Sequence, residues 1–281
     1  MSWLVLASTD GPHISLKAEP VFTIGSLNIT NSMLYGVIIA VAIIILGVIA
    51  GKSAGIKPAR GITRLFEMGM EFVINLLAEI MGSRRKAYKY APVFGAYFVF
   101  IVISYLAGLF PLVGEGVTHN GSPLFRPFTA DLNATLALAL SAIILVQYFS
   151  IKESGLKGHL KHYFSDKPLN PLNFFIGLLE VFGELTRVIS LSLRLFFNTA
   201  MGDILIAIFA FIGANAATFT LLPIMVFEIL VAFIQAYVFT VLSATYLALA
   251  TAHSEHEHQT EEQFSYSQSQ TGLMVEELAN G

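Results

Sequence analysis

Long runs of residues without a charge constrain this chain more than any other feature. Residues 33–50, 91–113 and 132–151 carry no acidic or basic side chain. Each run is about as long as the roughly 20 residues that a helix needs to cross the hydrocarbon core of a membrane. Residues 204–252 form a longer apolar tract that only Glu228 interrupts, so this tract must turn back on itself.

Composition supports the same interpretation. Hydrophobic residues make up 55% of the chain, charged residues 12%, and the mean hydropathy is +0.70. Soluble domains carry about 25% charged residues. The chain has no cysteine, which excludes disulfides, iron–sulfur ligation, thiolate zinc sites and cysteine nucleophiles. We therefore expect an all-α, polytopic membrane protein.

The last two spans are predicted to form an unusual hairpin. A helix that starts near Pro171 and ends near residue 212 would measure about 60 Å, twice the hydrocarbon thickness. Such a helix must either break or lie steeply tilted beside its return helix at 221–252, and we favour the tilted hairpin. Gly213 and the following residues up to Pro223 are the expected corner. Five membrane spans result.

Residues 62–81 have a different pattern. Glu67, Glu71 and Glu79 recur at helical spacing among apolar residues. This predicts an amphipathic helix at the membrane interface or against a partner. A poorly inserted span is the alternative, but three acids would be costly at the bilayer centre.

The positions of lysine and arginine predict the orientation. Eight basic residues lie between the first two spans and four follow the third, whereas the opposite side has Lys17 and Arg126. By the positive-inside rule the basic regions are cytoplasmic. We expect an external N-terminal arm (1–30), a single membrane domain (31–252) and an acidic cytoplasmic tail (253–281). The tail has six glutamates and no lysine or arginine, and we expect it to be flexible or to bind a partner.

Polar side chains in the last two spans are the candidate functional residues. Glu180, Glu184, Arg187, Arg194 and Asn198 follow one another at intervals of 4, 3, 7 and 4 residues, which places them along one broad helical stripe. A permanent guanidinium such as that of Arg194 needs a protein interior, a watery cleft or a counter-charge. This stripe, together with the polar residues that follow it, predicts an ion path. The residues that follow are Asp203, Glu228 and Gln235.

Structural roles are the alternatives for most of these residues. Glu180, Glu184 and Arg187 could form ion pairs within one helix near the membrane surface. Asn198 and Gln235 could be interhelical hydrogen-bond partners. Arg194 has no acid three or four residues away, so a purely structural role explains it poorly.

Four motifs carry a resemblance to a known family. They are SLSLRLFFN at 190–198, GD at 202–203, QAYVF at 235–239 and PFTADLNAT at 127–135. Together they resemble subunit a of the F-type ATP synthase membrane sector. The resemblance implies a stator subunit beside a rotating c-subunit ring and the peripheral-stalk b subunits, in a bacterial cytoplasmic (inner) membrane. It implies no catalytic residue, cofactor or metal in this chain.

The resemblance also implies residue roles. Arg194 matches the stator arginine that faces the ring carboxylate. Asp203 and Glu228 match the half-channel that opens to the outside, with Gln235 near its inner end. Glu180 matches an acidic position of the cytoplasmic half-channel.

Asn198 matches the family's asparagine one turn beyond the arginine, and two other positions depart from the family's usual pattern. Phe197 stands where the family usually has glycine. The outer half-channel often pairs an acid with a histidine, whereas Asp203 and Glu228 are both acids. Two neighbouring carboxylates can share a proton, which suits a relay.

Other function classes remain open at this point. A secondary transporter or channel with an intramembrane ion pair is the main alternative, although no internal repeat is evident. A scaffold subunit without an ion role would leave Arg194 unexplained. The segment GVIAGKS at 47–53 is one residue short of a phosphate-binding loop and ends an apolar span. His253, His256 and His258 are more typical of a solvated tail than of a metal site.

Overall fold

The computed structural model of the chain describes residues 20–24, 27–53, 61–110, 113, 118–119, 122–123, 125–163, 171–213 and 217–280. Side chains in the last helix are described only as far as Thr251. The fold is helical, as predicted. Its helices are α1 (Asn31–Ser53), α2 (Ile62–Met81), α3 (Arg84–Gly108), the 3₁₀ turn η1 (Phe128–Ala130), α4 (Leu132–Tyr163), α5 (Pro171–Gly213) and α6 (Ala217–Asn280).

Five of these helices are long and apolar enough to cross a membrane, which confirms the prediction of five spans. Two short hairpins were not predicted: β1 (Pro20–Ile24) pairs with β2 (Leu27–Thr30), and β3 (Thr118–His119) pairs with β4 (Ser122–Pro123). All four strands lie outside the spans. The spans are Asn31–Lys52, Arg84–Gly108, Leu132–Glu153, Gly177–Gly213 and Phe219–Thr251.

The chain divides into two compact units. The first unit comprises residues 1–141 and 186–242, and the second comprises residues 142–185 and 243–281. In the second unit, α4 is interrupted at Gly155, whose φ of 74° is a conformation that favours glycine. The predicted site residues Arg194, Asp203 and Glu228 all belong to the first unit.

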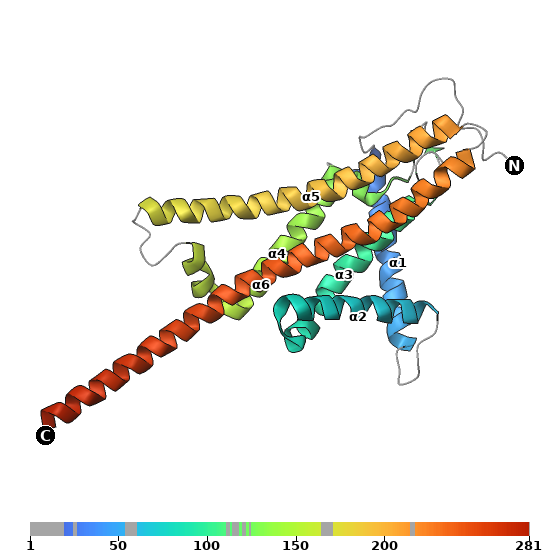
Figure 1. The fold of residues 1–281 in the computed structure, drawn as a ribbon. Coiled ribbons are helices and arrows are strands. Elements are labelled where there is room, and N and C mark those ends of the chain that lie inside the picture. Colours follow the sequence, from blue (N-terminus) through green and yellow to red (C-terminus); the bar gives the residue numbers. More distant parts are fainter. Residues whose placement is uncertain are drawn as a thin grey trace. The chain divides into compact units, whose positions relative to one another are not determined.

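Helix α2 has the predicted boundaries and the predicted two-faced character. Val73 and Leu77 are fully buried, whereas the three acids Glu67, Glu71 and Glu79 are exposed. Figure 1 shows α2 lying across α1 and α3, and it packs against both helices. The helix stops at Gly82, which has a left-handed φ of 64°. Ser83 then caps the start of α3 by accepting a hydrogen bond from the backbone of Lys86.

Asp131 joins the beginnings of two helices in the first unit. Its Oδ1 accepts a hydrogen bond from the backbone N–H of Asn133 at 2.9 Å and so caps α4. Its Oδ2 accepts a hydrogen bond from Ser32 Oγ, at the start of α1, at 2.6 Å. Tyr35, further along α1, donates to the carbonyl of Ala107 near the end of α3. The starts of α1 and α4 and the end of α3 therefore lie at the same end of this unit.

Helices α5 and α6 run antiparallel within the first unit. Thr220 donates a hydrogen bond to the carbonyl of Phe209, and further along Asn198 donates to Gln235. Pro223, which we expected at the corner, lies inside α6. Helix α6 also extends beyond its membrane span and continues to Asn280. The tilt of the hairpin in a membrane remains a prediction.

Candidate functional site

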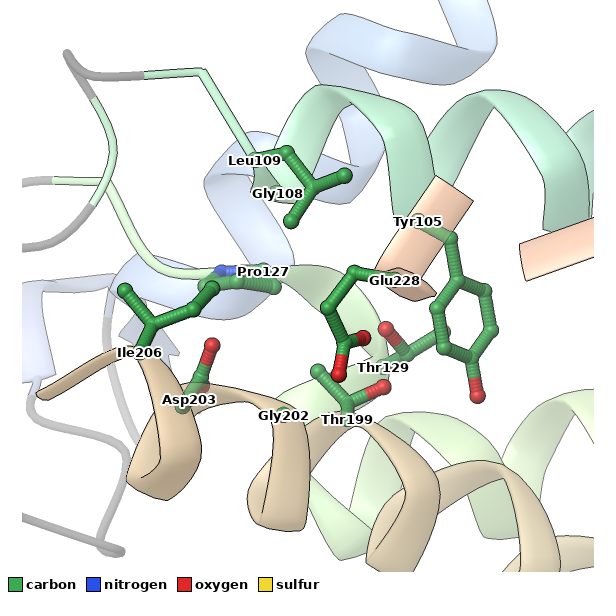
Figure 2. A pocket seen from close by; sticks show the side chains of 10 residues that line it. All are labelled: Tyr105, Gly108, Leu109, Pro127, Thr129, Thr199, Gly202, Asp203, Ile206 and Glu228. Atoms are coloured by element: carbon green, nitrogen blue, oxygen red, sulfur yellow. The ribbon is translucent and has the colours of Figure 1, made fainter. Parts of the chain in front are cut away.

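A small cavity in the first unit brings together parts of four segments. It has a volume of about 10 Å³, room for the centre of about one water molecule. Its walls come from the end of α3, the segment around η1, α5 and α6 (Figure 2). The lining residues are Tyr105, Gly108, Leu109, Pro127, Thr129, Thr199, Gly202, Asp203, Ile206 and Glu228.

The carboxyl group of Glu228 rests on the backbone of Gly202. A Cβ atom added to Gly202 would lie 2.6 Å from Glu228 Oε2 and 2.7 Å from Oε1. Such distances are far inside van der Waals contact, so only glycine leaves room for this carboxyl group on α5. Glu228 is thereby buried on α6 and shares the cavity with Asp203. The structure therefore brings together the two acids that the sequence singled out.

Arg126 provides a positive charge near this acid pair. Its side chain is 8% exposed, and its guanidinium donates a hydrogen bond to the carbonyl of Ala130 at 3.2 Å. Arg126 and Glu228 are the charged groups that act electrostatically on Asp203. The sequence had placed Arg126 only on the outer side of the membrane. Its position directly before the PFTADLNAT motif was the available signal of a closer role.

Tyr105 connects the cavity with the helix turn that follows Arg194. Its buried hydroxyl donates a hydrogen bond to the carbonyl of Leu195 at 2.8 Å, and Thr199 Oγ1 donates to the same carbonyl at 3.2 Å. The side chains of Asn198 and Thr199 also lie near the hydroxyl group of Tyr105. Sequence reasoning missed Tyr105, because nothing in α3 marks one tyrosine among its apolar neighbours.

Asn198 and Gln235 extend this polar chain to α6. Asn198 Nδ2 donates a hydrogen bond to Gln235 Oε1 at 3.3 Å, and Gln235 is 5% exposed. The interhelical hydrogen bond that we considered as a structural alternative therefore exists. It continues the polar contacts of Tyr105, so a structural role and a role in a path are compatible.

Arg194 lies on the opposite side of α5 from the cavity. Leu191, Ser192 and Leu195 are buried, whereas Arg194 and Phe197 are exposed. Ser192 packs toward α4, where its hydroxyl lies 3.2 Å from that of Thr135. Among the residues that the structure describes, Arg194 forms no ion pair or hydrogen bond. Its guanidinium is free to face a group outside this chain.

The structure leaves two other predictions untested. Glu180 is partly exposed in the second unit and is not among the residues that line the cavity. The tail residues His253, His256 and His258 lie outside the side chains that the structure describes. No group of three histidine or acidic residues that could hold a metal ion occurs among the described side chains.

Comparison of the sequence with known proteins shows which family the chain belongs to. The sequence model of the family "ATP synthase A chain" matches residues 33–248, which include every residue of the cavity. This chain belongs to the ATP synthase A chain family. It is therefore a non-catalytic, proton-translocating stator subunit of the membrane sector of F-type ATP synthase. This result decides against the self-contained transporter that the sequence had left open.

Individual bacterial members of the ATP synthase A chain family align over most of their length. ATP synthase subunit a of Moorella thermoacetica is 33% identical over 234 residues, which are 83% of this chain and 96% of the relative. The subunit a of Aquifex aeolicus is 33% identical over 222 residues, 77% of this chain and 94% of the relative. That of Geobacter sp. strain M21 is 32% identical and covers 80% of this chain and 89% of the relative.

Proposed function

We propose that the cavity of Asp203 and Glu228 is the outer half-channel of this subunit, through which protons reach a carboxylate on the c-subunit ring. The observation that carries the proposal is the burial of the Glu228 carboxyl group over Gly202 in the cavity that Asp203 also lines. Two acids in one water-sized cavity inside a membrane protein are costly, and acids retained at such a position typically mark an ion path.

The position of the cavity at one end of the first unit supports an opening toward the outside of the membrane. Gly108 ends α3, and Thr129 comes just before α4, so the cavity lies where α3 ends and α4 begins. Basic residues gather at the opposite helix ends, with Lys52 in the last turn of α1 and Arg84 in the first turn of α3. The positive-inside rule then makes the cavity end external, the N-terminus external and the C-terminus cytoplasmic.

The polar contacts of Tyr105 supply a route from the cavity toward the ring. The route passes Tyr105 and Asn198 and reaches Gln235. Gln235 lies about two helical turns beyond Glu228, on the same face of α6. Beyond it, α5 and α6 expose large apolar side chains, including Phe197, Met201 and Ile234. A c-subunit ring in the membrane would pack against such a surface.

Arg194 then separates the incoming and outgoing paths. Its exposed guanidinium attracts an ionised ring carboxylate and repels a free cation, so a proton cannot pass directly from one half-channel to the other. Glu180, on the part of α5 that precedes Arg194, is the proposed acid of the cytoplasmic half-channel. Each proton that crosses contributes about 2.3 kcal/mol per 100 mV of membrane potential to ring rotation.

The assembled complex provides the direct test. A cryo-EM map of the complex, with its c-ring, b subunits and catalytic head, should place the Arg194 guanidinium within reach of a ring carboxylate. The cavity of Asp203 and Glu228 should open on the side away from the catalytic head. A cavity that opens toward the head, or an Arg194 that faces lipid, would contradict the proposal.

A further inference from the structure

The hydroxyl group of Thr129 is an exception among the buried threonines that the structure describes. Thr199, Thr240 and Thr251 each donate their Oγ1 to a backbone carbonyl of their own helix. Thr129 is completely buried, yet its Oγ1 has no hydrogen-bond partner in the part of the chain that the structure describes. The large majority of buried hydroxyl groups in proteins have a hydrogen-bond partner, so this one requires an explanation.

The local backbone explains why the hydroxyl group of Thr129 has no hydrogen-bond partner in its own segment. A threonine within an α-helix bonds to the carbonyl three or four residues earlier. Thr129 is the middle residue of the three-residue turn η1, and Pro127 directly precedes that turn. No earlier helical turn offers it a carbonyl, so its hydroxyl is left for a group in the cavity that it lines.

The cavity offers the right surroundings for one water molecule. Figure 2 shows the Thr129 side chain between those of Glu228 and Tyr105. The volume of about 10 Å³ matches about one water molecule, which needs two to four polar partners. The carboxyl groups of Asp203 and Glu228 and the hydroxyl of Thr129 line the same space.

Proton transfer between the two acids also requires a carrier. Asp203 on α5 and Glu228 on α6 both line the cavity, so a water molecule in it can serve as that carrier. A water molecule between them could accept the proton of one carboxylic acid while it gives one of its own protons to the other carboxylate. The water is regenerated, and the Thr129 hydroxyl stays protonated throughout.

We propose that Thr129 is a water-positioning residue, and that it holds a single water molecule through which protons pass between Asp203 and Glu228. The inference rests on the proposed outer half-channel and assigns it an internal water site. In this role the threonine hydroxyl fixes the water's orientation, so that its lone pairs and protons face the two carboxyl groups.

The test compares Thr129→Val, Thr129→Ser and Ser104→Ala in the full complex. Valine keeps the shape and removes the hydroxyl, whereas serine keeps the hydroxyl. Ser104 is the matched control, because its Oγ is also buried without a partner among the described residues, but it does not line the cavity. The measurement is passive proton flux through membrane vesicles after the catalytic head is removed, in H₂O and in D₂O.

We expect Thr129→Val to lower the flux by about five- to tenfold, the effect of one lost hydrogen bond on a rate. The solvent isotope effect should rise, because transfer across the cavity becomes limiting. Thr129→Ser should restore the flux, and Ser104→Ala should leave it unchanged. Wild-type flux in Thr129→Val, or low flux in both Thr129 variants with normal assembly, would overturn the proposal.

A second measurement covers the case in which Thr129→Val fails to assemble. The chain has no cysteine, so Thr129→Cys introduces one thiol, and silver ions should then block proton flux if water reaches this position. Insensitivity to silver would contradict the water site. Asp203→Asn separates this inference from the proposed function: if it stops the flux while Thr129→Val does not, the half-channel stands and only the water site fails.

Discussion

The carboxyl group of Glu228 occupies the space that a side chain at position 202 would need. A Cβ at this position would meet three atoms of that carboxyl group within 2.7 Å. The two residues belong to different helices, so the absence of a side chain on α5 sets the position of an acid on α6. The approach of the two helices is therefore coupled to the geometry of the proposed proton path.

Gly202→Ala should impair proton transport without preventing folding. The added methyl group displaces the Glu228 carboxyl group, and overpacking of this kind costs about 1–3 kcal/mol. We expect passive proton flux to fall several-fold. Gly183→Ala is the matched control on α5, because nothing lies within 4 Å of its added Cβ. If the double variant Gly202→Ala/Glu228→Asp, with its shorter acid, recovers no flux, steric displacement is not the cause.

Asp203→Ala and Glu228→Ala should each slow the entry of protons from the outside. Each change removes one of the two acids that line the cavity, and the remaining acid has no partner for transfer. ATP synthesis in reconstituted vesicles, driven by an imposed proton gradient, measures the effect. Unchanged synthesis rates in both variants would remove these residues from the path.

Most of the fold follows from the sequence because the membrane limits the possibilities. Charge-free runs of membrane-spanning length predicted three spans, and the long apolar tract that follows them predicted the hairpin of the other two. The spacing of the acids predicted α2 with its observed ends. The helix of the second span begins and ends earlier than expected: α3 comprises Arg84–Gly108, whereas the span was expected near 91–113. Basic residues such as Arg85 can begin a membrane helix, since their long side chains reach the interface.

The site was less predictable because tertiary contacts assemble it. Asp203 and Glu228 stood out as acids in apolar sequence, but Tyr105 and Thr129 carry no such mark. They come from segments far from α5 in the sequence and meet it only in the folded unit. Gly202 was noted only as part of a motif, because a single sequence does not reveal which side chain fills the space above a glycine.

Arg194→Ala should abolish coupled proton transport and ATP synthesis while the complex still assembles. The side chain is exposed and makes no ion pair or hydrogen bond with the described residues of this chain, so its loss leaves nothing buried and unpaired. Copurification with the c-ring measures assembly, and proton-driven synthesis measures coupling. Lys152→Ala, which removes another exposed cation, is the control and should retain both properties. Synthesis at wild-type rates in Arg194→Ala would contradict the proposed role.

Asp131→Ala should lower the thermal stability of the complex, but it should not change the transport rate of each complex that assembles. It removes the cap of α4 and the hydrogen bond from Ser32, a combined loss of about 1–3 kcal/mol. The complex should dissociate at a lower temperature in a thermal melt. Asp131→Asn can still cap the helix, so its dissociation temperature should lie between those of Asp131→Ala and the wild type. A transport defect at unchanged thermal stability would instead place Asp131 in the proton path.

Tyr105→Phe should distinguish the contribution of the Tyr105 hydroxyl group from that of its ring. The ring still fills its buried position, but the Leu195 carbonyl loses its hydrogen bond from α3, a net effect of about 1 kcal/mol. Because this carbonyl directly follows Arg194 and the same hydroxyl contacts Asn198, we expect proton flux to fall about fivefold with assembly unchanged. Tyr97→Phe is the matched control on α3, since its hydroxyl bonds to Ser141 outside the cavity. Equal losses of flux in the two variants would mean that the hydroxyl of Tyr105 only stabilises helix packing.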